Sequence, residues 1–224
     1  MQKNNYIMDK DIQAIIFDCD GVLVDSEYYS CYALNILFEK YYNIDIGNDY
    51  TQVLGTSLKS TINYYFDKFK ITNYTDSDLQ KFFEEKDGIY KQLAKNKLKT
   101  FPGIEELIKF ALKNDIKIAV GSSGTLNKIL FSLRETGLDK YFKIITSSDE
   151  VIHGKPNPEL FLITAKKLQL DPENCLVIED SVSGIAAAKA ANMKAIGITN
   201  TFSKDVLEKT MADKVIKNVL ELLS

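Results

Sequence analysis

The sequence predicts an α/β fold: a doubly wound, mostly parallel, Rossmann-like sheet with a second, smaller all-helical unit. Three observations support this prediction. Short apolar runs without alternation recur along the chain, as in strands that are covered on both faces. Beyond residue 100, these runs alternate with segments of helical periodicity. After the first run, the next clear strand does not begin until residue 116, which indicates a long insertion.

Six apolar runs are predicted to form the strands of the sheet. They are rich in isoleucine and valine, which favour the extended backbone. Their lengths suit strands rather than helices. The runs are residues 12–17, 116–120, 142–146, 175–179, 194–198 and 214–216.

Helices are predicted between these strands. Apolar residues in 104–112 and again in 126–133 recur at the i, i+3, i+4, i+7 spacing, and Gly137 follows the second segment. Asn157 and Pro158 offer an N-cap followed by a proline at the first position of a third helix. Such a fold places ligand chemistry at the carboxyl ends of the strands.

Residues 27–97 are predicted to form a helical domain inserted into a core made of 1–26 and 98–224. Two hinges would connect the parts, near Val24–Glu27 and Lys97–Gly103. The tyrosines and phenylalanines of the insertion are interpreted mainly as the core of its helices. These aromatic-rich helical segments lie near 28–42, 48–69 and 76–96.

The composition is typical of a folded protein with a small-molecule partner. With 45% hydrophobic and 26% charged residues, the chain can bury enough apolar surface to fold without a disulfide or zinc. The 28 basic and 31 acidic residues give a net charge of −3, which argues against nucleic acid or an anionic membrane as a partner. We expect a monomer.

Residue types that are scarce exclude several kinds of site. His153 is the only histidine and Arg134 the only arginine, which argues against histidine triads and multi-arginine phosphate clamps. The three cysteines form no CxxC pair. The first residues lack the pattern of a signal peptide, and no apolar run is long enough to span a membrane. We therefore expect a cytoplasmic protein.

The most informative segment follows the first predicted strand. Asp18 and Asp20 stand two residues apart, a pair that suits a hard cation or a nucleophile with a neighbouring acid. Gly21 allows a sharp turn there. Alone, the pair could also be a turn with solvated aspartates. A calcium loop is excluded because residues 22–24 are apolar.

Two later strands are also followed by polar segments. Ser122, Ser123 and Gly124 enter a helix and suit phosphate binding, although a simple Ser/Thr helix cap explains them equally well. Lys155 stands in a turn stiffened by two prolines, where its charge could neutralise a phosphoryl group, or it could be an ordinary surface lysine. His153 is interpreted as a loop residue.

Another acidic pair, Glu179 and Asp180, ends a fourth strand. These carboxylates could bind a metal, or Asp180 or Ser181 could simply cap the following helix. Taken together, the acidic pair, serine, lysine and second acidic pair each follow a separate strand. In a parallel sheet, those positions converge on one point.

With these four segments, the chain resembles the haloacid dehalogenase superfamily, in particular its β-phosphoglucomutase-like phosphatases. The matching motifs are FDCDGVLVDSE, GSSG, GKPNP and IEDSVSG, in that order, and the insertion follows the first of them. The resemblance spans essentially the whole chain. It implies a phosphatase with a helical cap that acts on a small phosphorylated metabolite.

The resemblance also implies a role for each motif residue. Asp18 would be the nucleophile that forms an aspartyl-phosphate, and Asp20 would be the general acid and base. Ser122 would hold phosphoryl oxygens, and Lys155 would tie the nucleophile to the phosphoryl group. Other residues expected to contact phosphate or substrate are Gly21, Ser123 and Gly124.

A magnesium site is implied by the same resemblance. Asp18, Asp180 and the backbone carbonyl of Asp20 would bind Mg²⁺, and Glu179 would be a direct or water-mediated ligand. An all-oxygen set of this kind suits a hard cation.

The type of reaction is less fixed. Asp20 is typical of phosphatases and phosphomutases and not of the dehalogenases. Positions where related sugar mutases carry an arginine and a histidine correspond to Leu58 and Tyr29, so we favour hydrolysis of a sugar or sugar-acid phosphate. Lys59 could still hold a distal phosphate in a mutase. An inactive binding module would be expected to have lost Asp18, Asp20 or Lys155.

Overall fold

A computed structural model describes residues 11–47, 50 and 52–223. Six strands form one parallel sheet with the order β5-β4-β1-β6-β7-β8, which confirms the predicted α/β class. β1 lies inside the sheet, between β4 and β6. The strands are β1 (Ala14–Phe17), β4 (Lys117–Gly121), β5 (Ile145–Thr146), β6 (Cys175–Glu179), β7 (Lys194–Ile198) and β8 (Lys214–Ile216).

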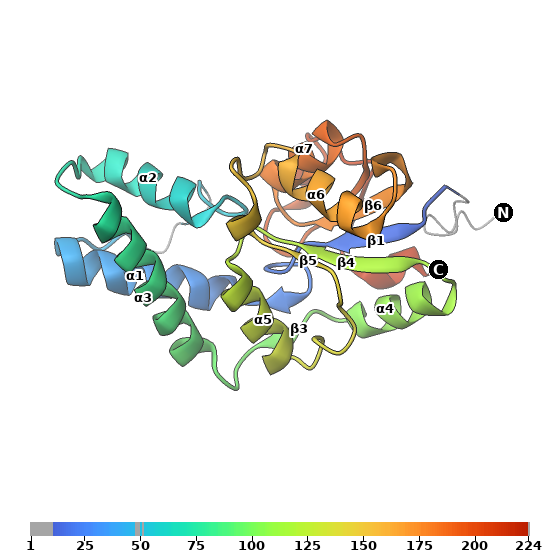
Figure 1. Ribbon diagram of the computed structural model, residues 1–224, viewed down its shortest axis with the longest axis horizontal. Helices are drawn as coiled ribbons and strands as arrows, with labels where there is room; N and C mark the ends of the chain where they lie inside the picture. The colour runs from blue at the N-terminus through green and yellow to red at the C-terminus, as the bar shows by residue number, and fades with distance from the viewer. Residues whose placement is uncertain (1–10, 48–49, 51, 224) are drawn as a thin grey trace.

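Helices cover both faces of this sheet (Figure 1). On one face, Ile15 and Phe17 of β1 pack with α4 (Ile104–Lys113) and α5 (Leu126–Glu135). On the other face, Ala14 and Ile16 pack with three further helices. These are α6 (Glu159–Leu168), α7 (Val182–Ala190) and the short α8 (Lys204–Leu207). Short 3₁₀ turns span Ser148–Glu150, Pro172–Asn174 and Val219–Leu222.

Three helices, α1 (Glu27–Tyr42), α2 (Leu58–Phe69) and α3 (Asp76–Ala94), form the insertion (Figure 1). It is connected through β2 (Val24–Asp25) and β3 (Lys99–Thr100), which pair antiparallel. Aromatic side chains form much of its own core, as predicted. The ring of Phe38 lies 5.4 to 5.9 Å from the rings of Tyr65, Phe66 and Phe82.

Some predicted bounds differ from the observed ones. The helix expected over 48–69 begins only at Leu58, where Ser57 caps it; residues 48, 49 and 51 lie outside the described part. The strand expected over 142–146 is limited to Ile145–Thr146, because Phe142 turns into the core and packs on Phe17. α6 begins after Pro158, one residue later than expected.

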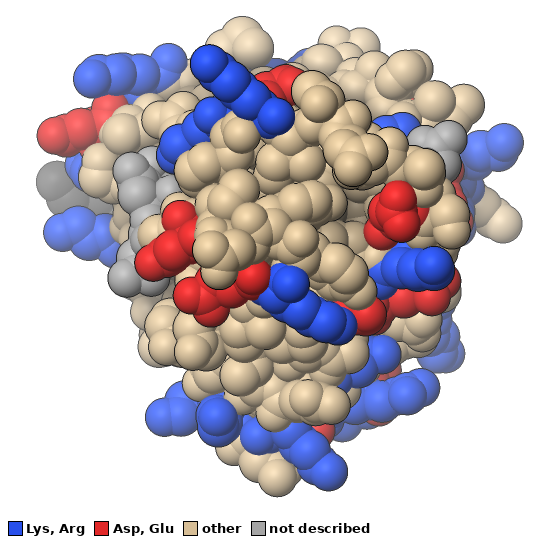
Figure 2. Space-filling model, turned by 90° about the vertical axis from the view of Figure 1, so that its left-hand side faces the viewer, with Lys and Arg blue, Asp and Glu red and all other residues tan. Residues whose placement is uncertain are grey.

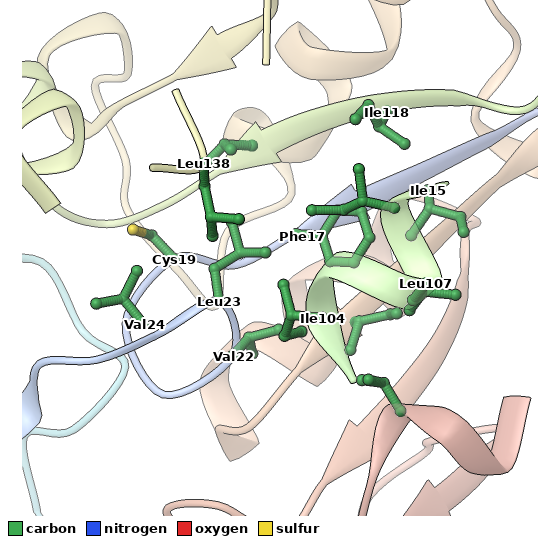
Figure 3. Packing of buried hydrophobic residues seen from close by; sticks show 14 of the residues in the cluster. Ile15, Phe17, Cys19, Val22, Leu23, Val24, Ile104, Leu107, Ile118 and Leu138 are labelled. Carbon is green, nitrogen blue, oxygen red and sulfur yellow. The ribbon is translucent and has the colours of Figure 1, made fainter. Parts of the chain in front are cut away.

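The loop after β1 is anchored in the apolar core (Figure 3). Cys19, Val22 and Leu23 are almost completely buried and belong to the same cluster as Ile104 and Leu107 of α4. The acidic residues of this loop therefore stand on a rigid support. In the described ranges, no helix combines the length and apolar character needed to cross a membrane.

Candidate active site

A pocket lies where the carboxyl edge of the sheet meets the insertion. Asp18 and Asp20 line it together with residues 122–125, which follow β4, and Lys128 of α5. The insertion supplies the opposite wall, and polar side chains are common there. The insertion residues that line the pocket are Glu27, Ser30, Cys31, Leu34, Tyr50, Val53, Leu54, Gly55, Thr56, Leu58, Thr61, Lys86 and Asp87.

Lys155 joins two of the predicted carboxylates at the base of this site. Its Nζ lies 2.6 Å from Asp18 Oδ1 and 2.7 Å from Glu179 Oε1, and it also donates to the carbonyl of Gly121 at 3.3 Å. The ammonium is almost fully buried. Burial disfavours its charge, but Asp18 and Glu179 outweigh that effect and raise the pKa of Lys155 above its ordinary value. Lys155 therefore stays positively charged beside Asp18.

Asp18, Glu179 and Asp180 form a compact acidic group. Each offers a carboxylate oxygen, these oxygens lie within 4.8 Å of one another, and all three residues are buried. Burial, together with the charges of Glu179 and Asp20, raises the pKa of Asp18 to about 7 against the effect of Lys155. Burial and the charges of Glu179 and Asp18 raise the pKa of Asp180 well above its ordinary value.

The single charge of Lys155 does not balance three buried carboxylates, so a further positive charge would stabilise the group, and its oxygen donors suit a hard divalent cation. Gly21 makes room for the acidic group, because a Cβ at this residue would lie 1.9 Å from Asp180 Oδ2. The second oxygen of Glu179 accepts hydrogen bonds from the backbone N–H and hydroxyl of Ser181, each at 2.8 Å. Asp18, Asp180 and Glu179 could therefore hold a metal ion, with Glu179 the most fixed of the three.

Asp20 has both carboxylate oxygens engaged. Oδ1 accepts a short hydrogen bond from the Ser26 hydroxyl, and Oδ2 lies 2.7 Å from Lys128 Nζ. Burial would raise the pKa of Asp20, but Lys128 and the hydrogen bond from Ser26 lower it below its ordinary value. Ser26 stands at the N-cap position of α1 without forming a side-chain cap. Its hydroxyl donates its hydrogen bond to Asp20 instead.

The segment after β4 contains a helix cap, one of the two interpretations that the sequence left open. Thr125 caps α5 by accepting from the backbone N–H of Lys128 at 3.2 Å. Ser122 is buried, lines the pocket, and accepts from the N–H of Gly124 at 3.2 Å. The cap therefore falls on Thr125, while Ser122 lies in the wall of the pocket.

Gly55 brings the insertion against the core loops. Its carbonyl accepts from Ser183 Oγ at 3.1 Å and from Ser123 Oγ at 3.4 Å. A Cβ at Gly55 would lie 2.3 Å from Ser181 Oγ, so the approach is closer than any other residue would allow. The structure therefore has the insertion docked over the site.

On the insertion side, polar groups surround the space above Asp20. Burial and the charge of Lys128 lower the pKa of Lys86 to about 8, and its Nζ donates to Ser30 Oγ at 2.8 Å. Burial and the charge of Asp20 raise the pKa of Glu27 to about 7. Glu27 also accepts a weak hydrogen bond from the Cys31 thiol at 3.8 Å. This wall therefore presents both hydrogen-bond donors and hydrogen-bond acceptors to the pocket.

The other residues that the sequence analysis singled out lie partly in the pocket and partly outside it. Leu58 lines the pocket, but Lys59 is exposed and is absent from the lining, so it is not placed to hold a distal phosphate. Tyr29 packs against the core cluster. His153 is exposed on its loop and Arg134 is exposed on α5.

Sequence reasoning missed Lys86, Lys128 and Ser26. Lysines in amphipathic helices ordinarily face solvent, so nothing in the local pattern marked the first two as buried. In the structure, Lys128 and Ser132 are buried together with their apolar neighbours Ile129 and Leu133. The outer end of the insertion shows basic and acidic side chains interspersed with uncharged surface (Figure 2).

Comparison with known proteins gives a consistent picture. Residues 15–198 match the haloacid dehalogenase-like hydrolase family. The phosphorylated carbohydrates phosphatase of Thermotoga maritima is 32% identical over 190 residues, covering 83% of this chain and 84% of that protein. The β-phosphoglucomutase of Bacillus subtilis is 32% identical, covering 84% and 83%. The structure of β-phosphoglucomutase from Clostridium difficile superimposes with a TM-score of 0.83 at 30% identity, covering 92% and 91%.

Proposed function

The chain belongs to the haloacid dehalogenase-like hydrolases, in their β-phosphoglucomutase-like branch, and we propose that it hydrolyses the phosphomonoester of a small sugar or sugar acid. It is a phosphoric monoester hydrolase of this family. One observation supports the proposal most: buried Asp18, held by Lys155, faces the same pocket as Asp20 and Ser122.

In the proposed reaction, an oxygen of Asp18 attacks phosphorus while the bond to the leaving oxygen breaks. Asp20, which Lys128 and Ser26 make a stronger acid than an ordinary carboxyl group, gives its proton to that oxygen when it is protonated. The oxygen departs as an alcohol and leaves an aspartyl-phosphate on Asp18. A water molecule then gives a proton to Asp20 and attacks phosphorus, and inorganic phosphate departs from Asp18. Lys155 and Ser122 hold the phosphoryl oxygens, aided by backbone N–H groups near Gly21, Ser123 and Gly124.

We further propose Mg²⁺ as the cation, held by Asp18, Asp180 and the carbonyl of Asp20, with Glu179 direct or through water. The buried acidic group described above fits it. When bound, Mg²⁺ supplies positive charge that offsets the charge of the phosphoryl oxygens. Residues 27–97 serve as a cap that excludes water from the core of 1–26 and 98–224 and reopens for product release.

The nucleophile can be tested directly. Asp18→Asn should remove at least about 99% of the release of inorganic phosphate, because an amide is a poor nucleophile of nearly the same shape. The assay is run on a panel of sugar and sugar-acid phosphates, and Asp139→Asn, on an exposed loop, is the control. A folded Asp18→Asn protein with more than a few per cent of wild-type activity would contradict the mechanism.

A phosphomutase is the second candidate, favoured by the similarity to β-phosphoglucomutases. A mutase must grip a distal phosphate, which a planar arginine does best, and the described pocket lining contains lysines but no arginine. We therefore expect inorganic phosphate to appear faster than isomerised sugar phosphate. A phosphorus NMR time course with β-glucose 1-phosphate, primed with the bisphosphate, distinguishes the two.

A further inference from the structure

Lys128 forms a buried ion pair with the proposed acid and base. Its Nζ lies 2.7 Å from Asp20 Oδ2, and the two side chains are only 8% and 13% exposed. Ser26 holds the other oxygen of Asp20. The carboxyl group is therefore fixed from two sides, by a residue before the insertion and by a residue of α5.

The position of Lys128 depends on the core and the insertion together. The ring of Tyr90, from α3, lies 5.1 Å from Lys128 Nζ. The Tyr90 hydroxyl is 2.7 Å from Ser132 Oγ, which donates to the carbonyl of Lys128 at 2.9 Å. One turn away, Thr125 of the core donates a short hydrogen bond to Asp87 of α3. Packing of α3 against α5 therefore completes the set of contacts that holds Lys128.

Stability alone does not account for such a pair. Removing two charges from water costs several kcal/mol per ion in a protein interior, and an apolar pair of similar size is often as stable. The pair is also directed into the pocket, beside Asp18 and Ser122, rather than into the core. A role in holding Asp20 explains the burial of this ion pair better than stability does.

We propose that Lys128 is a positioning residue for Asp20. It aligns the carboxyl group with the leaving oxygen of the substrate, and its charge stabilises the carboxylate that remains once the proton has moved to that oxygen. The inference rests on the proposed function. Because Tyr90 of α3 lies against Lys128, docking of the insertion contributes to this alignment of Asp20.

The leaving group provides the test. A sugar phosphate releases a strongly basic alkoxide that needs a proton, whereas p-nitrophenyl phosphate releases a weakly basic phenolate that does not. We compare kcat/KM, which covers the steps up to departure of the leaving group, and so excludes the later hydrolysis of the aspartyl-phosphate. Both substrates are measured on the same preparation, so the ratio of the two values does not depend on the folded fraction.

In Lys128→Met, kcat/KM should fall by about 10- to 100-fold for the sugar phosphate and by less than about 3-fold for the aryl phosphate, as expected for impaired general-acid catalysis. Lys128→Arg keeps the charge and should recover most of the loss. Arg134→Met, an exposed cation on the same helix, should match the wild type. If Lys128→Met does not fold, Lys128→Gln should show the same selective loss.

Two results would overturn the inference: equal losses for both substrates, or no loss for the sugar phosphate. Both leave the phosphatase proposal intact. If the wild type hydrolyses neither ester in the presence of Mg²⁺, the proposed function itself fails. The two failures are therefore distinguishable within one set of assays.

Discussion

At the scale of single residues, Gly21 is required by its backbone and by its neighbour. Its φ is +77°, and a Cβ would lie 1.9 Å from Asp180 Oδ2. Gly21→Ala should displace Asp180, lower activity by at least about 100-fold, and cost about 1 kcal/mol of stability through the left-handed backbone. Gly137→Ala is the control, because Gly137 has φ +69° but no neighbour within 4 Å.

Activity assays and denaturant unfolding of both variants separate the two effects. Gly137→Ala should lose stability to a similar degree and keep its activity. Equal activity in the two variants would show that the approach of Asp180 to Gly21 has no role in catalysis.

Glu27 gives a prediction about pH. Its pKa rises from 4.5 to about 7 on folding, so the folded protein binds more protons there than the unfolded chain between these values. The stability contributed by Glu27 is therefore full below about pH 4.5 and is lost as the pH rises through 7. Glu27→Gln should be more stable than the wild type at pH 8, by on the order of 1–3 kcal/mol, and equal to it near pH 4.

Urea unfolding of the two proteins at pH 4, 6 and 8 measures this difference. Asp139→Asn, on an exposed loop, should show no comparable trend. A difference between Glu27→Gln and the wild type that stays constant with pH would contradict the assignment.

At the scale of elements, the docked loop at Gly55 should control activity more than stability. In Gly55→Ala the new Cβ would meet Ser181 and keep the insertion from docking, so we expect kcat/KM to fall by at least about 10-fold. Gly88→Ala is the matched control within the insertion. Gly88 lies inside α3 with no neighbour within 4 Å, so alanine there should raise stability by about 0.5–1 kcal/mol and leave kcat/KM unchanged.

Steady-state kinetics and thermal unfolding of both variants test this expectation. If Gly55→Ala keeps full activity, close docking of this loop is not needed for turnover. If it loses activity only in proportion to a loss of folded protein, the effect is on stability alone.

Local sequence patterns predicted the bounds of some strands well and missed others. β6, β7 and β8 have the predicted bounds, because continuous apolar runs between polar turns leave little freedom of register. β2 and β3 have two residues each, too few for any periodicity. The segment before α2 was expected to be helical, but Gly55 adopts φ +76° there to reach the core loops.

At the scale of the whole molecule, some residues of the site could be predicted from the sequence and others could not. Asp18, Ser122, Lys155 and Asp180 follow separate strands, so the topology of a parallel sheet was enough to predict that they meet. Lys128 is different, because it lies on α5 and contacts Asp20 after β1 and Tyr90 of α3, which are far from it in sequence. Contacts between elements far apart in sequence leave no local pattern, which is why such residues escaped prediction.

Metal binding should stabilise the entire fold. The buried carboxylates of Asp18 and Asp180 have raised pKa values, so a cation that binds the folded state relieves an unfavourable charge. At 100 times Kd, Mg²⁺ should add about 2.7 kcal/mol, or about 5–10 °C in Tm for a chain of this size. Differential scanning fluorimetry with Mg²⁺ or EDTA measures this shift. It should be much smaller in Asp180→Ala, and equal Tm values for the wild type in both conditions would contradict the site.

The pairing of β2 with β3 has a practical consequence for protein engineering. Val24 faces Thr100 and Asp25 faces Lys99, so the chain leaves the core and returns to it on adjacent strands. A foreign helical segment grafted between these two strands would need to span only the width of a hairpin. The core and its carboxylates would then stay constant. A library of grafted segments would vary only the pocket wall that the insertion supplies, which contacts the leaving group.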